Sequence, residues 1–171
     1  MAEIVTYLEM KSPDELTEAT AIPGVRLERA ETGSPLIREL LVRVGRPHKW
    51  RTVSWSEEQW AEYLNDPLRQ AWFITRDDDA GPQYAGIASY LPNGTPDGGV
   101  EIQISHFGLV PEYVGRGLGG HALTLTIQTA WTLNPSTTRV WLHTSTLDHP
   151  NALPNYQKRG LRPYTTKVRE D

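Results

Sequence analysis

The chain has 171 residues, 38% hydrophobic and 22% charged, with a formal net charge of −4 at pH 7. This length and composition are typical of one globular domain, and the negative charge gives no reason to expect nucleic acid or an anionic membrane as a partner. The lack of cysteine excludes disulfides and thiolate chemistry and is typical of a reducing compartment. We find neither a secretory signal nor the ~18 consecutive apolar residues of a membrane span, so we expect a cytoplasmic protein.

The first half of the sequence predicts two short strands followed by two helices. The strands are expected at residues 4–10 and 24–30, and the helices within residues 34–45 and 54–67. Each helix begins near a serine that can cap it, which is Ser34 in the first and either Ser54 or Ser56 in the second. Apolar residues recur at helical spacing behind each cap.

The second half switches to the periodicity of strands. Strands are expected at residues 70–75, 83–91, 100–110, 138–145 and 161–168. A long helix follows the third of these runs and reaches about Leu133, and a short helix is expected within residues 149–160. The turn-rich segments 76–83 and 92–99 separate the earlier strands. This order predicts a mixed α/β sheet in a single domain.

Glycines gather at the start of the long helix, in the segment VGRGLGGHALTLTIQTAW (residues 114–131). They occupy four of six positions, at Gly115, Gly117, Gly119 and Gly120. Glycine costs roughly 0.5–1 kcal/mol per site relative to alanine in regular structure, so the cluster favours a ligand that approaches the main chain closely. A helix N-terminus attracts phosphate, and Arg116 adds a positive charge. The plainer alternative is a tight turn from strand to helix.

The spacing Gly115-x-Gly117-x-x-Gly120 matches the dinucleotide-binding fingerprint only in its glycines. The segment PEYV separates them from the preceding strand, and no acidic residue that could bind a ribose hydroxyl lies between Glu112 and Asp148. Too little chain follows to complete a Rossmann domain. A nucleoside triphosphate P-loop is excluded because no Gly-Lys-Ser/Thr follows.

With its flanks, the segment LVPEYVGRGLGGHAL (residues 109–123) resembles the coenzyme A motif of the GNAT N-acetyltransferase superfamily. That motif is a strand, a V-x-P corner and Q/R-x-x-G-x-G/A at the start of a long helix. Val114 stands where the family has Gln or Arg. The segment HPNALPNYQKRGL (residues 149–161) is similar to the family's N-x-x-A-x-x-x-Y-x-x-x-G-F pattern through three residues, Ala152, Tyr156 and Gly160. The resemblance covers about residues 84–165, and residues 1–83 match only in outline.

This resemblance implies a mostly antiparallel central sheet flanked by helices, with residues 1–83 on the acceptor side and residues 84–171 binding coenzyme A. It implies an acetyl-CoA-dependent N-acetyltransferase in which an amine attacks the thioester directly in a ternary complex, without a metal. A small-molecule or peptide amine is the expected acceptor, and a homodimer is a further expectation. The alternative is a non-catalytic module that binds acyl-CoA or a nucleotide, and a nicotinamide oxidoreductase is a distant third.

The resemblance also assigns roles to individual residues. It implies that the strand ending in HFGLV diverges from VWLHT and that pantetheine lies in the gap. Main-chain groups of Leu109 and Val110 would then bind pantetheine and the acetyl oxygen, and Asn151 would offer a polar contact. The diphosphate would be held by the amides of Gly115, Arg116, Gly117, Leu118, Gly119 and Gly120. Tyr156, a phenol with an ordinary pKa near 10, would line the same site and protonate the departing thiolate.

The general base is left open by the sequence. Glu101, Gln103 and Ser105 alternate onto one face of a predicted strand. Relatives that use a strand glutamate place it closest to position 103, which is Gln here, so Glu101 would act through a water. His106 joins that face only if a bulge intervenes, and His143 is a further candidate. A structural role is the plainer reading of each.

Residues 43–60 interleave basic residues with three tryptophans, Trp50, Trp55 and Trp60. This pattern suits an acceptor that bears a carboxylate or phosphate, and also single-stranded nucleic acid. The plainer reading is that the tryptophans belong to the core and the arginines to a solvated surface. His143, Asp148 and His149 lie close in sequence, but their spacing fits no zinc site.

Overall fold

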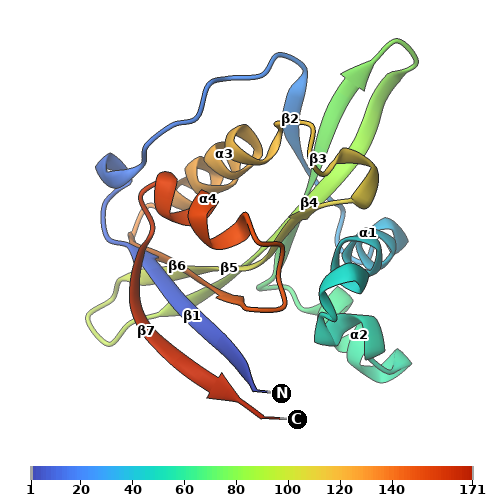
Figure 1. The fold of residues 1–171 in the computed structure, drawn as a ribbon. Helices are drawn as coiled ribbons and strands as arrows, with labels where there is room; N and C mark the ends of the chain where they lie inside the picture. The colour runs from blue at the N-terminus through green and yellow to red at the C-terminus, as the bar shows by residue number, and fades with distance from the viewer. Residues whose placement is uncertain (1, 171) are drawn as a thin grey trace.

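A seven-stranded sheet organises the chain, for which the computed structural model describes residues 2–170 (Figure 1). The strands are β1 (Glu3–Met10), β2 (Val25–Arg29), β3 (Gln70–Asp78), β4 (Gly81–Gly94), β5 (Val100–Leu109), β6 (Thr137–Ser145) and β7 (Arg162–Arg169). The helices are α1 (Pro35–Gly45), α2 (Glu57–Asn65), α3 (Gly119–Thr132) and α4 (Ala152–Lys158). Short 3₁₀ turns are η1 (Pro13–Glu15), η2 (Arg46–His48), η3 (Arg51–Ser54) and η4 (Pro111–Tyr113).

The strand order is β2-β3-β4-β5-β6-β1-β7, and every neighbouring pair is antiparallel except β5 and β6. That parallel pairing is short, because it joins only residues 100–103 of β5 to residues 137–141 of β6. Both strands continue beyond it, to Leu109 and Ser145, without pairing to each other. The sheet therefore opens in its middle, as the family resemblance implied.

Helices cover both faces of the sheet, over different strands (Figure 1). On one face α3 and α4 lie side by side, and Leu123 and Ile127 of α3 pack in one buried cluster with Ile102 and Ile104 of β5. On the other face α1 and α2 pack over β3 and β4 in a second cluster that includes the fully buried Leu40. The expected class, a single domain with a mostly antiparallel sheet flanked by helices, is confirmed.

The two N-terminal helices begin differently from one another. Ser34 precedes α1 but its side chain makes no capping hydrogen bond, so Pro35 at the first turn is the start signal that the helix uses. α2 has a full capping box, in which the Gln59 N–H donates to Ser56 Oγ (3.2 Å) and the Ser56 N–H donates to Gln59 Oε1 (2.9 Å). Ser56, not Ser54, is therefore the cap of α2.

The segment 76–83, expected as a turn, is mostly strand. Asp77 and Asp78 at the end of β3 pair with Pro82 and Gly81 of β4. Ladder hydrogen bonds use the main chain, so acidic side chains that point to solvent do not prevent the pairing.

Candidate active site

A cavity of about 540 Å³ opens where β5 and β6 part. Its wall combines the end of β5, the glycine turn before α3 and one side of α4, together with side chains from the region after α1. Main-chain groups at the end of a strand and at the start of a helix thus face the same space. Such a volume is in the range of small-molecule binding sites.

The glycine turn presents bare backbone to this cavity. Gly115 and Gly117 have φ of 80° and 78°, a conformation that favours glycine, and a Cβ at either position would meet no atom within 4 Å. Leu118, between them and α3, is buried with 2% of its surface exposed and anchors the turn to the core. The first N–H groups of α3 have no partner within the helix and are available to an anion. Gly119 and Gly120 also line the cavity.

Positive charge reaches the turn from α4. Lys158 and Arg159, from the end of this helix, line the cavity, and Arg159 Nη1 lies 3.2 Å from the position that a Cβ on Gly120 would take. Arg159 Nε is buried and has no hydrogen-bond partner in the described part of the chain. Arg116, the cation expected from the motif, lies over the ring of Tyr113 at 5.1 Å. The sequence reasoning missed Arg159, although it directly precedes the motif residue Gly160.

Tyr156 of α4 lines the cavity and is 7% exposed. Its ring meets that of Phe107 on β5 edge to face, with centroids 6.3 Å apart. Burial raises the pKa of the Tyr156 phenol well above its usual value, and the charge of Asp148 raises it further. The hydroxyl is therefore protonated at neutral pH.

At the end of β5, the main-chain N–H groups of Val110 and Leu109 point in opposite directions. The Val110 N–H donates to the Ala85 carbonyl of β4 at 2.8 Å, so this amide is held by the sheet. Leu109 pairs with Gly86, and its own N–H points away from β4, because successive main-chain groups of a strand face opposite sides. The Leu109 N–H thus faces the gap left by β6. Of the two positions expected to bind pantetheine, Leu109 has the available amide.

Hydrogen bonds from the loop between β6 and α4, and from α4 itself, connect separate parts of the cavity wall. Asp148 Oδ1 accepts from Trp50 Nε1 at 2.9 Å, and its Oδ2 accepts from Thr144 Oγ1 (2.6 Å) and the Ser145 N–H (2.9 Å). Asn151 is exposed at the cavity wall. Asn155 Nδ2 donates to the Gly119 carbonyl at 3.2 Å and so links α4 to the glycine turn. Sequence reasoning singled out neither Asn155 nor the bond between Trp50 and Asp148.

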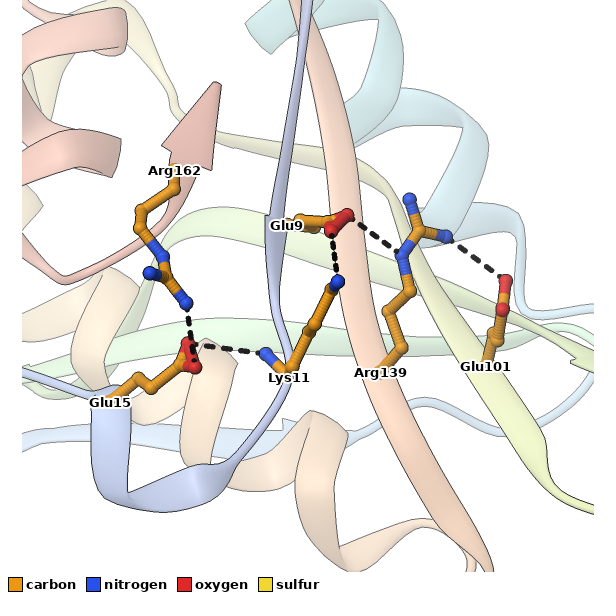
Figure 2. Close-up of polar contacts among 6 residues, drawn as sticks. All are labelled: Glu9, Lys11, Glu15, Glu101, Arg139 and Arg162. Carbon is orange, nitrogen blue, oxygen red and sulfur yellow. Dashed lines mark hydrogen bonds and ion pairs between the residues drawn. The ribbon is translucent and has the colours of Figure 1, made fainter. Parts of the chain in front are cut away.

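Glu101 and Gln103 lie outside the cavity lining. Glu101 Oε2 accepts from Arg139 Nη1 at 3.0 Å, and Arg139 Nε also donates to Glu9 Oε2 at 3.2 Å (Figure 2). Lys11 Nζ in turn lies 3.4 Å from Glu9 Oε1. Gln103 stands opposite Trp141 at the last parallel pair of β5 and β6. Glu101 thus stands at the end of a row of ion pairs that crosses β5, β6 and β1.

Two of the histidines proposed as bases, His106 on β5 and His143 on β6, lie in the part of these strands that is not paired to the other, and neither lines the cavity. β5 contains the bulge that His106 required, because Ser89 pairs with His106 while Tyr90 pairs with Ile104. His106 Nδ1 is 2.8 Å from Ser89 Oγ, and burial, with smaller effects of Arg69 and His143, lowers the pKa of His106 to about 3. His143 lies on β6, two residues beyond the last parallel pair.

Burial also lowers the pKa of the His143 imidazole, and the nearby charge of Arg169 has the same effect. Asp148 and Glu3 act in the opposite direction and Lys167 in the same one. Both imidazoles are neutral at pH 7. Within residues 2–170 no group of His, Asp and Glu side chains is arranged to hold a metal ion.

The three tryptophans of residues 43–60 have separate places. Trp60 of α2 is 2% exposed in the buried cluster that α1 and α2 share, and Trp55 packs against it with ring centroids 5.0 Å apart. Trp50 is half-buried and lines the cavity, 5.4 Å from the ring of His106. The plainer reading, in which these tryptophans pack internally, thus describes Trp55 and Trp60, whereas Trp50 belongs to the site.

Comparison with known proteins places this geometry in a family. The sequence profile of the acetyltransferase (GNAT) family matches residues 37–161, and the chain belongs to this family. Members of the family are acetyltransferases. Among curated protein sequences no relative was found. None of the helices formed by residues 2–170 has the length and apolar character needed to cross a membrane.

Solved structures share the fold at low identity. A tandem GNAT protein from the clavulanic acid biosynthesis pathway aligns with 18% identity and a TM-score of 0.61, over 98% of this chain and 51% of that one. An acetyltransferase from Trypanosoma brucei aligns with 21% identity and a TM-score of 0.60, over 86% and 99%. An aminoglycoside acetyltransferase from an uncultured soil metagenomic sample, in complex with sisomicin, aligns with 14% identity and a TM-score of 0.62, over 80% and 87%. The chain spans only 51% of the length of the first of these.

Proposed function

We propose that this chain transfers an acetyl group from acetyl-CoA to a primary amine. The observation that carries the proposal is that the bare glycine turn and a buried, protonated tyrosine line the same cavity. The backbone at Gly115 and Gly117 is open to the cavity, and Arg159 Nε is buried there without a hydrogen-bond partner among residues 2–170. These features fit a diphosphate, which needs many N–H donors and positive charge.

In the proposed reaction, acetyl-CoA supplies the acyl group as a thioester. The Leu109 N–H, facing the gap between the strands, donates to the carbonyl oxygen as negative charge develops on it. The Tyr156 hydroxyl donates its proton to the sulfur as the bond between carbon and sulfur breaks. Each of the two groups stabilises charge that appears only during the reaction.

The proton that the attacking amine loses must leave on the acceptor side. Glu101 is held in an ion pair by Arg139, so we assign it no proton transfer. We propose instead that the proton passes through water to His143, which does not line the cavity but has a neutral imidazole and lies on β6 just beyond the last parallel pair. The nearby His106 is also neutral, but with a pKa of about 3 it is a weak base.

The acceptor class is tested with a panel of amines. Purified protein is incubated with acetyl-CoA and, in turn, with aminoglycosides, polyamines, amino acids and a lysine peptide, and the release of free thiol is followed. Aminoglycosides belong in the panel because a solved structure with this fold is an aminoglycoside acetyltransferase. We expect thiol release that depends on one class of amine and on Tyr156. Tight binding of acetyl-CoA without amine-dependent release would favour the non-catalytic module.

A further inference from the structure

One part of the cavity wall comes from the first half of the chain. Val44 of α1 and Trp50, between η2 and η3, lie there beside Phe107 and Gly108 of β5. Phe107 is also the residue on which the Tyr156 ring packs. A ligand that starts at the glycine turn and extends past Tyr156 therefore meets Val44 and Trp50 immediately beyond the tyrosine.

The tip of the Trp50 indole covers the main chain of Gly108. A Cβ added to Gly108 would lie 3.7 Å from Trp50 Cη2 and would collide with Val44 Cγ1. The next residue is Leu109, whose N–H we assign to the thioester carbonyl. The space beside the main chain that precedes this N–H is thus already filled by the indole and by Val44, which is 2% exposed.

The indole is fixed on several sides. Its Nε1 donates to Asp148, and Asp148 is itself held by Thr144 and the Ser145 N–H. The ring also packs on Gly45, where an added Cβ would lie 2.7 Å from Trp50 Cε3. Lys49, the residue before Trp50, has φ of 56° and is the non-glycine residue with positive φ among residues 2–170. A rare backbone conformation thus precedes a side chain that cannot move without breaking several contacts.

We propose that Trp50 sets the length of the acyl chain and restricts the enzyme to acetyl-CoA among the acyl-CoAs. Asp148 is the positioning residue that holds the indole in place. This inference rests on the proposed function and names the acyl group that the site takes. A longer acyl chain would have to displace the indole or overpack the wall, and both are costly in a close-packed region.

The test measures the affinity of acetyl-, butyryl-, hexanoyl- and octanoyl-CoA by calorimetry without an acceptor, so the result does not depend on knowing the amine. We expect the wild type to bind acetyl-CoA about tenfold or more tightly than hexanoyl-CoA. Trp50→Ala should reverse the order and gain up to about fourfold in affinity per buried methylene. Asp148→Ala should reduce the preference for acetyl-CoA over the longer acyl-CoAs, as Trp50→Ala does.

Trp55→Ala is the matched control, because it removes an indole from the same segment that does not line the cavity. It should keep the wild-type order of affinities. Trp50→Leu serves as a second variant if the alanine variant does not fold, and the wild-type order is informative by itself. Equal wild-type affinity for all chain lengths, or an unchanged order in the Trp50 variants, overturns the inference alone. A wild type that binds no acyl-CoA overturns the proposed function as well.

Discussion

Tyr156 and His106 show how burial decides the protonation state of single residues in this site. Burial disfavours the charged form of each group, so it raises the pKa of the phenol and lowers that of the imidazole. The phenol stays protonated and can donate, and the imidazole stays neutral. Each state leads to a measurable expectation.

Tyr156→Phe removes the proposed proton donor and keeps the ring that packs on Phe107. We expect turnover to fall by roughly 10²- to 10⁴-fold, the usual contribution of a general acid, while the affinity for acetyl-CoA stays within about twofold. Thiol release with the accepted amine measures the first quantity and calorimetry the second. Unchanged turnover would show that the proton comes from elsewhere.

His106 makes the stability of the protein depend on pH. The folded-state pKa is about 3, whereas histidine in an unfolded chain titrates near 6.5. Between these values the unfolded chain binds the additional proton, so the free energy of unfolding falls as the pH drops from 7 towards 3.

From pH 7 to pH 5 we expect a loss on the order of 1–2 kcal/mol that is attributable to this residue. His106→Gln should lose correspondingly less over the same interval, as measured by urea unfolding at both pH values. His143 contributes in the same direction in both proteins and cancels from the comparison. Identical pH dependence in variant and wild type would contradict the assignment.

Motif spacing predicted only some of the residues that line the cavity. The positions matched to the family's two motifs, the glycine turn and Tyr156, lie in one cavity. Arg159 beside Gly120 and the bond between Trp50 and Asp148 join residues distant in sequence, and no local pattern predicts such pairs. For the same reason the sequence did not show that Arg139 engages Glu101.

Among the elements, the turn into α3 is the one to which we assign the diphosphate. It combines two glycines of positive φ with the free N–H groups of a fourteen-residue helix. The turn is held by Leu118 on the core side and by Asn155 through the Gly119 carbonyl. The backbone is thus arranged before any ligand binds, which lowers the entropic cost of binding.

Gly117→Val puts a branched side chain into this turn and into the cavity. We expect acetyl-CoA binding to be lost, with a decrease of roughly 1–2 kcal/mol in the free energy of unfolding from the positive φ. Gly33→Val is the matched control, because Gly33 has a similar φ of 81°, is surrounded by open space and does not line the cavity. Both variants should lose similar stability, and only Gly117→Val should lose binding. Retained binding in Gly117→Val, measured by calorimetry, would exclude the turn as the diphosphate site.

Element types followed from periodicity, but their limits and pairing did not. The period of 3.6 predicted α1 and α2, and alternation predicted the strands, because each pattern reflects one buried face. Segment 76–83 became a hairpin because backbone pairing, which sequence composition does not reveal, extended both strands. The divergence of β5 from β6 was implied by the family resemblance and not by residue spacing.

In the whole molecule, the cavity is lined by the end of β5 and by residues from both halves of the chain. The glycine turn and Tyr156 belong to the segment of α3 and α4, which pack on one face, and Trp50 follows α1, which packs on the other face. We accordingly propose that coenzyme A binds on the side of residues 84–171 and the amine on the side of residues 1–83.

The binding of acetyl-CoA tests this account most directly. Calorimetry and thermal unfolding of the wild type should show one molecule of acetyl-CoA bound per chain. A ligand concentration of 100 times the dissociation constant should add about 2.7 kcal/mol to the free energy of unfolding. NADH and ATP should give no comparable stabilisation. Failure of acetyl-CoA to bind or to stabilise the protein, or equal stabilisation by NADH, would contradict the assignment of the cavity to coenzyme A.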